Sequence, residues 1–135
     1  MNKTDLVEAL KGLDICYMHT HATDGGSNTR PMSNNGDVEW EGTNWFFTNG
    51  DTAKVAEIEA DDRVLLTFAG EDSWIALYGH AVLHRDDRAL FEEHWVPDLE
   101  AWFEDGIDTP GLTLIEVNAE RAQGWGRVGD GSLDL

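Results

Sequence analysis

Residues 45–60 place a hydroxyl group and an ammonium group where a strand gives way to a helix. The pattern predicts an aromatic strand over 45–48, a break over 49–51 and a short helix over 52–60. The first turn of a helix exposes unpaired N–H groups and a partial positive charge. Thr52 at the cap and Lys54 in the same turn can therefore hold a phosphate group. The alternative is a surface lysine that pairs with Glu57, three residues further on.

The segment Arg30-Pro31-Met32 supplies a second chemical element. Pro31 has no N–H for a sheet ladder, so we expect this strand at an edge or a bulge, where backbone polar groups stay unpaired. Such groups can bond the polar edge of a flat heteroaromatic ring, while Met32 packs on its face. Arg30 can balance charge on the ring or on a phosphate. The alternative is an ordinary edge strand with a surface arginine.

Other reactive residues form weaker patterns. His19 and His21 share a face of a predicted strand and would need a further histidine to bind a transition metal. No carboxylate spacing completes such a site, so packed or hydrogen-bonded histidines are the simpler interpretation. Cys16 has no base at a diagnostic spacing, and the chain lacks a Gly-x-Gly-x-x-Gly or phosphate-loop motif. We therefore predict no catalytic side chain and no metal ligand.

The elements that position these groups are short strands joined mostly by turns. Strands are predicted over 15–20, 28–32, 45–48, 64–68, 74–83, 112–117 and 123–128, with turns at 24–26, 34–37 and 70–72. Helices are predicted from a cap at Thr4 or Asp5 to about Gly12, over 52–60, and from a cap at Asp86 or Asp87 until Pro97 interrupts it. This order predicts one domain over residues 1–135, mainly β with short helices, arranged as an antiparallel barrel.

The charge balance is strongly acidic. The 135 residues carry 27 Asp and Glu against nine Lys and Arg, a formal net charge of −18. Such a surface repels nucleic acid and anionic lipid, so neither is an expected partner, and no apolar run is long enough for a membrane span. Many aspartates and few lysines resemble the composition of proteins from salt-loving cells. A single cysteine excludes an internal disulfide and favours a reducing cytoplasm.

Several short motifs together resemble one protein family. The chain is similar to the FMN-binding split barrels related to pyridoxamine phosphate oxidase, and most similar to their general stress protein branch. The resemblance covers roughly residues 5–125 and is carried by the order of these motifs: Thr29-Arg30-Pro31-Met32, Trp45-Phe46-Phe47-Thr48, Thr52-Ala53-Lys54, Gly79-His80-Ala81, Asp86-Asp87-Arg88, Trp95-Val96-Pro97, Trp102-Phe103 and Gly106-Ile107-Asp108-Thr109-Pro110.

This resemblance implies an antiparallel Greek-key split β-barrel that forms a homodimer, with two FMN sites at the subunit interface. It implies that Arg30, Pro31 and Met32 border the isoalloxazine, and that Phe47 and Thr48 line the ribityl and ring region. Thr52 and Lys54 would hold the phosphate. Two tryptophans would cover the flavin, in part from the second subunit: Trp95 and Trp102.

The resemblance is incomplete near the C-terminus. Pyridoxamine phosphate oxidases carry basic and histidine substrate-binding residues there, whereas residues 123–130 of this chain read QGWGRVGD. Oxidation of vitamin B6 phosphates is therefore not expected. Three interpretations stay open: an FMN-dependent oxidoreductase, a non-catalytic flavin-binding stress protein, and a cofactor-free acidic β-barrel dimer.

Overall fold

The structure, a computed structural model, describes residues 1–36 and 38–135. The predicted turn at 34–37 therefore ends on Asp37, which lies outside the described residues. The strands are β1 (Ile15–His21), β2 (Ser27–Ser33), β3 (Thr43–Asn49), β4 (Arg63–Ala69), β5 (Ser73–His84), β6 (Leu112–Gly126) and β7 (Gly131–Asp134). The helices are α1 (Lys3–Leu10), α2 (Ala53–Ala60), α3 (Arg88–His94) and the 3-10 turns η1 (Pro97–Ala101) and η2 (Gly106–Asp108).

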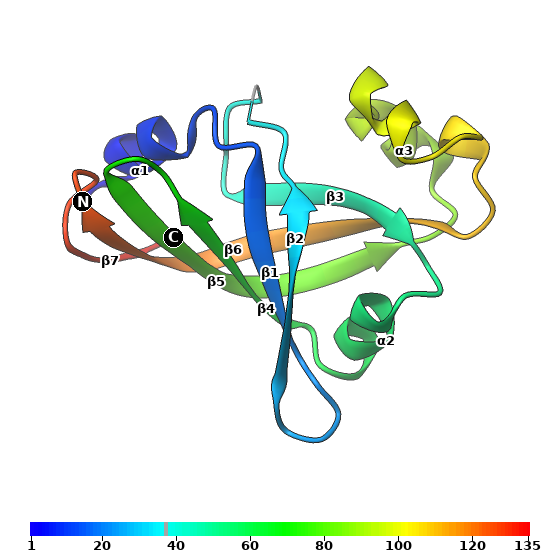
Figure 1. The fold of residues 1–135 in the computed structure, drawn as a ribbon, viewed down its shortest axis with the longest axis horizontal. Helices are drawn as coiled ribbons and strands as arrows, with labels where there is room; N and C mark the ends of the chain where they lie inside the picture. The colour runs from blue at the N-terminus through cyan, green and yellow to red at the C-terminus, as the bar shows by residue number, and fades with distance from the viewer. Residues whose placement is uncertain (37) are drawn as a thin grey trace.

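The strands form one antiparallel sheet that curls around an apolar core (Figure 1). Its order is β2-β1-β4-β5-β6-β3, and β7 pairs with β6 beside this path. The two ends of the path, β2 and β3, contribute Met32 and Phe46 to the same core cluster. No ladder joins these two strands in the described part of the chain. The barrel is therefore split between them, as the sequence predicts.

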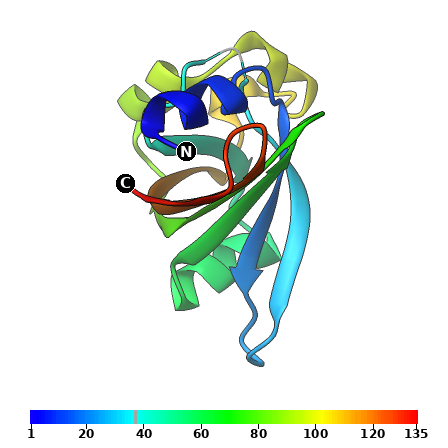
Figure 2. The same ribbon diagram turned by 90° about the vertical axis from the view of Figure 1, so that its left-hand side faces the viewer.

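One end of the barrel is covered by α1, which lies near both termini (Figure 2). Leu6 and Leu10 of this helix are buried in the core. The helix begins earlier than predicted, because Asn2 is its N-cap and forms a capping box with Asp5. Thr4 and Asp5 are thus inside the helix and do not cap it.

A second apolar cluster lies outside the barrel, where α3 and η1 cover β3 and β6. It contains the buried side chains Phe91, Phe103, Leu112 and Leu114, with Trp45, Phe47 and Trp95 packed against them. Pro97 begins η1, which agrees with the predicted interruption. Because this cluster uses the outward side chains of β3, that strand is enclosed on both faces.

The C-terminal strands differ from the prediction. Residues 112–117 and 123–128 were expected as two strands, but β6 runs unbroken from 112 to 126, and β7 was not predicted. A register shift at Tyr78 and Gly79 lets β5 pair along this long strand. A Cβ on Gly79 would lie 2.0 Å from the carbonyl oxygen of Asn118, so only glycine permits this approach. Within the described residues, no helix is long and apolar enough to cross a membrane.

Candidate functional site

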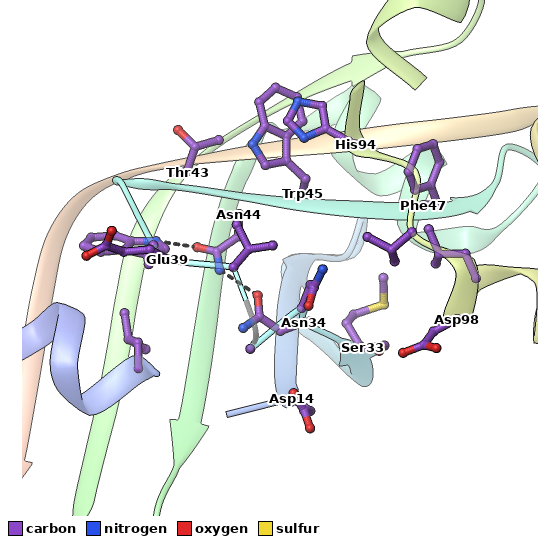
Figure 3. A pocket seen from close by; sticks show the side chains of 18 of the residues that line it. Asp14, Ser33, Asn34, Glu39, Thr43, Asn44, Trp45, Phe47, His94 and Asp98 are labelled. Atoms are coloured by element: carbon purple, nitrogen blue, oxygen red, sulfur yellow. Dashed lines mark hydrogen bonds between the residues drawn. The ribbon is translucent and has the colours of Figure 1, made fainter. Parts of the chain in front are cut away.

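A large cavity lies beside the split in the barrel, between the segment around β2 on one side and α3 with η1 on the other (Figure 3). Its volume is about 1160 Å³. Six of the nine predicted site residues line it: Pro31, Met32, Phe47, Thr48, Lys54 and Trp102. Four separate motifs of the sequence therefore meet at one cavity, because β2, β3, the start of α2 and the end of η1 converge there.

The ammonium group of Lys54 lies among hydroxyl groups at one end of the cavity. Its Nζ donates a hydrogen bond to Thr48 Oγ1 at 2.8 Å and a longer one to Thr52 Oγ1 at 3.4 Å. No described carboxylate forms an ion pair with it. Burial, together with the nearby charge of Arg30, lowers the pKa of Lys54. A half-buried cation without a carboxylate partner, in a chain of net charge −18, is suited to an anionic ligand.

The start of α2 leaves its first N–H groups without a side-chain cap. Thr52 is the N-cap residue, as predicted, but its hydroxyl donates to the carbonyl oxygen of Asn49 and does not accept from the helix. The turn from β3 into α2 is held by a hydrogen bond from Gly50 N to Gly111 O, at 2.8 Å. Uncapped amides and the ammonium of Lys54 thus share one helix terminus.

The guanidinium of Arg30 points away from the cavity and into a buried polar cluster. It pairs with Glu57 of α2 at 3.1 Å and donates to Thr20 Oγ1 and to the carbonyl oxygen of Met18. Glu57 also accepts from Thr20 and Asn28. Glu57 therefore pairs with Arg30 and not with Lys54, which was the alternative interpretation. Arg30 is not among the described residues that line the cavity, so its place here is to fix α2 against β1 and β2.

The two predicted covering tryptophans occupy different environments. Trp95 packs edge-on against Phe47, at 5.1 Å between ring centroids, and against Phe103 in the second apolar cluster. Trp95 is not among the described residues that line the cavity. Trp102 lines the cavity and is 75% exposed. In this chain Trp95 is thus a packing residue, and only Trp102 is placed at the cavity rim.

Sequence reasoning missed a polar chain that closes one side of the cavity. Trp40 Nε1 donates to Asn44 at 2.9 Å, and Asn44 Nδ2 donates to Asn34 at 2.8 Å (Figure 3). The second bond links β3 to the residue that follows β2, and so bridges the split in the barrel. Asn44 alternates with partly buried positions in β3, but its partners lie in irregular segments whose conformation no periodicity reveals.

A stack of aromatic rings on β3 was also missed. The ring of His94 lies on Trp45 with centroids 3.8 Å apart, and His84 lies on the same indole at 6.2 Å. His84 hydrogen-bonds to Glu116 at 2.8 Å. Both Trp45 and His94 line the cavity. The signal for this stack was the outward position of Trp45, which alternates with buried Phe46.

The other reactive residues are placed where they have structural partners. Burial raises the pKa of Cys16 to about 12, so this thiol is a poor nucleophile. His19 hydrogen-bonds to Thr67 and Thr29 through its two ring nitrogens. Among residues 1–36 and 38–135, no three histidine, cysteine or acidic side chains are grouped to hold a metal ion.

The outward face of β2, β1, β4 and β5 contains no acidic residue in these four strands, and large apolar side chains lie on it beside Trp125 of β6. Tyr17 is in register with Pro31 and Thr67, and Trp74 is in register with Trp125. Ile15, Tyr17, Trp74 and Trp125 are all about half exposed, between 46% and 55%. Carboxylates beside this face pair with basic residues: Asp61 with Arg63, and Asp62 and Glu120 with His80. Asp134 of β7 is in register with Arg121 of β6. We call the outward side chains of β1, β2, β4 and residues 73–80 of β5, together with Trp125 of β6, the acid-free face.

The chain as a whole matches a known family. Residues 2–133 match the family model described as pyridoxamine 5'-phosphate oxidase like. This match spans nearly the whole sequence, so the chain belongs to that family. The family predicted from the sequence motifs is therefore confirmed. No match was found among curated proteins.

Solved structures agree with the family and the fold. A Clostridium acetobutylicum protein related to general stress protein 26 has a TM-score of 0.84 at 21% identity, covering 100% of this chain and 97% of its own. General stress protein 26 of Bacillus anthracis has a TM-score of 0.80 at 18% identity, covering 98% of both chains. The general stress FMN/FAD binding protein of Xanthomonas citri is 30% identical over 96% of this chain and 90% of its own, with a TM-score of 0.73. The antiparallel split-barrel fold is therefore confirmed.

Proposed function

We propose that this chain binds flavin mononucleotide in the cavity, with the phosphate at the start of α2. The observation that carries this proposal is the Lys54 ammonium, which contacts two threonine hydroxyls beside uncapped helix amides and has no carboxylate partner among the described residues. A phosphate monoester supplies the charge and the acceptor oxygens that these donors lack. The similarity to a protein named for FMN/FAD binding favours a flavin as the molecule that carries this phosphate.

The flavin ring would lie along β2 and β3. Pro31 is exposed and Met32 is buried at the cavity wall, so a flat ring would meet an edge strand and a soft apolar surface there. Phe47 and Thr48 form the neighbouring wall, from β3. Thr48 lies between the ring region and Lys54, where its hydroxyl accepts from the ammonium and orients it.

We further propose that the protein is a flavin-dependent oxidoreductase. Bound FMN supplies electron or hydride transfer, while the protein supplies binding and orientation. No side chain of this site is required as a nucleophile, which agrees with the inert environment of Cys16. The non-catalytic alternative is tested by anaerobic reduction with NADH or NADPH followed by addition of electron acceptors. Flavin that no acceptor reoxidises faster than free FMN would favour a storage or sensing role.

The phosphate role of Lys54 is tested by comparing two ligands that differ only in the phosphate. Lys54→Ala should weaken FMN binding about tenfold or more, because a charge-assisted hydrogen bond contributes about 1.5–3 kcal/mol. It should leave riboflavin binding nearly unchanged. Lys3→Ala, an exposed lysine of α1, is the matched control. Equal losses for FMN and riboflavin, or no FMN binding by the unaltered chain, would refute the assignment.

We also propose that two copies of the chain pair through the acid-free face and complete the site. Half-exposed Tyr17, Trp74 and Trp125 form a patch of a kind that marks interfaces. A chain of net charge −18 repels a second copy least where the contact surface carries the fewest carboxylates, and β1, β2, β4 and β5 contain none. Pro31 belongs both to the face and to the cavity wall, so a partner covering the face would border the flavin.

Analytical ultracentrifugation of a variant with one substitution tests whether two copies pair through the acid-free face. Tyr17→Lys places a charge in the acid-free face and should convert the dimer to a monomer with weakened FMN binding. Val82→Lys changes an equally exposed apolar residue that lies on another part of the sheet, beside Glu116, and should leave the dimer intact. An unaltered chain that remains a monomer at high concentration and high salt would contradict the proposal.

A further inference from the structure

The cavity extends beyond the part that the proposed function assigns to the cofactor. Pockets for a single small ligand usually measure about 300–1,000 Å³, and this one measures about 1160 Å³. Under the proposed function, the phosphate and ring of the cofactor take the end formed by β2, Thr48 and Lys54. The remaining wall includes α3, η1 and Trp45, none of which the proposed FMN site uses.

This remaining wall is aromatic. Trp45 and Trp102 line it from β3 and from the end of η1. His94 is stacked on Trp45 and holds the indole in place (Figure 3). Trp102 is 75% exposed, which is unusual for a large ring without a partner in the described chain. Such a wall suits a flat ring.

The charges that α3 and η1 place on this wall are negative. Five carboxylates line the cavity: Glu93 and Asp98 on this wall, and Glu8, Asp14 and Glu39 elsewhere, where Lys11 also lines it. None of the five forms an ion pair with another described residue. Lys54 lies at the cofactor end, so its charge is used by the phosphate. Carboxylates beside aromatic faces attract cations and repel anions.

We propose that this part of the cavity binds a second molecule, an aromatic substrate that is uncharged or cationic, and that it excludes aromatic anions. The proposal rests on the proposed function, because it assigns the Lys54 end to the cofactor. It agrees with the expectation that anionic B6 phosphates are not substrates of this chain: the Lys54 position is assigned to the cofactor, and α3 and η1 place carboxylates on the remaining wall.

Three probes with the same rings and different charge test the proposal: 1-naphthylmethylamine, 1-naphthalenemethanol and 1-naphthoate. Binding is measured by calorimetry in the FMN-saturated full chain at low salt. The ammonium and the alcohol should each bind at least about tenfold more tightly than the carboxylate. Naphthoate that binds as tightly as the ammonium, or no binding by any of the three, would overturn the proposal.

Charge variants separate the cavity from the general field of the protein. Combining Glu93→Gln with Asp98→Asn should strengthen naphthoate binding, weaken binding of the ammonium and leave the alcohol unchanged. Glu92→Gln with Glu100→Gln is the matched control, since these acids lie on the same two helices but do not line the described cavity. Equal effects of the two pairs would overturn the proposal, because net charge alone would then explain the preference.

The two proposals fail in different ways. If FMN binds in a Lys54-dependent manner but the three probes bind equally, the second site is refuted and the proposed function stands. If FMN does not bind, the proposed function is refuted. The probe series, repeated on the chain without FMN, then still reports whether the acidic aromatic wall selects against anions.

Discussion

At the scale of single residues, the site depends on keeping two neighbouring cations distinct. Arg30 is neutralised by Glu57, whose side chain is 9% exposed, whereas Lys54 has only hydroxyl partners in the described structure. Because Glu57 neutralises Arg30 and not Lys54, the ammonium charge of Lys54 is available to a ligand. Because both Glu57 and Lys54 belong to α2, the same helix carries the buried anchor and the ligand-binding group.

Removing the Glu57 carboxylate, which anchors α2 through Arg30, should destabilise the fold. Glu57→Gln leaves the Arg30 charge uncompensated in a mostly buried place and should lower the free energy of unfolding by about 3 kcal/mol, measured in urea. Glu59→Gln breaks an exposed pair of the same helix with Arg85 and should cost less than about 1 kcal/mol. The double variant Arg30→Met with Glu57→Gln should recover part of the loss. Equal, small effects of the two single changes would show that the buried pair does not anchor α2.

The lowered pKa of Lys54 predicts the pH dependence of cofactor binding. Only the charged ammonium attracts a phosphate, and burial with the nearby Arg30 charge lowers this pKa below the ordinary lysine value. Phosphate affinity is therefore fully present at neutral pH and falls as the pH rises through the Lys54 pKa, earlier than for an exposed lysine. Measuring the affinity for FMN and for riboflavin across the same pH range isolates this effect, because both ligands contain the same ionisable flavin ring and only FMN has the phosphate. A parallel decline for the two ligands would contradict it.

At the scale of elements, the sequence predicted those parts that local chemistry determines. The strand–turn–helix unit at 45–60 has aromatic alternation, an Asn-Gly-Asp break and a threonine cap, and it was found where predicted. The direction of the Arg30 side chain was not predictable, because its partner Glu57 is brought there by packing of α2 on β1. The continuous β6 was missed because its middle pairs only through the register shift opposite Gly79.

The turn between β3 and α2 gives a prediction at this scale. A Cβ on Gly50 would lie 2.8 Å from both Gly111 O and Thr113 Oγ1. Gly50→Ala should therefore displace the turn, cost about 1–3 kcal/mol of stability and weaken FMN binding by moving Lys54. Gly26→Ala, in the exposed β1–β2 turn, is the control, since its nearest contact is a side-chain oxygen at 3.2 Å. Unfolding curves that coincide for the two variants would show that the turn tolerates the shift.

At the scale of the whole molecule, charge is distributed unevenly. The net charge is −18, yet the four strands of the acid-free face, β1, β2, β4 and β5, contain Arg63 and no acidic residue. The cavity has Lys54 at one end, and five carboxylates with one further lysine, Lys11, elsewhere on its wall. An overall acidic surface is therefore compatible with a site for an anion, because Lys54 has no carboxylate partner among the described residues.

The same excess of carboxylates predicts that salt stabilises the fold. Screening shortens the reach of charge from about 10 Å in 0.1 M salt to about 3 Å in 1 M salt, so self-repulsion weakens as KCl is added. The melting temperature should rise by several degrees over this range, at constant protein concentration so that dimer dissociation does not contribute. Four exposed acids outside the described ion pairs, Glu71, Glu100, Glu104 and Asp105, allow a matched test. Replacing them with Gln or Asn should raise the melting temperature in 0.1 M KCl and reduce the further gain in 1 M. A melting temperature that ignores KCl would mean that self-repulsion does not limit the stability of this chain.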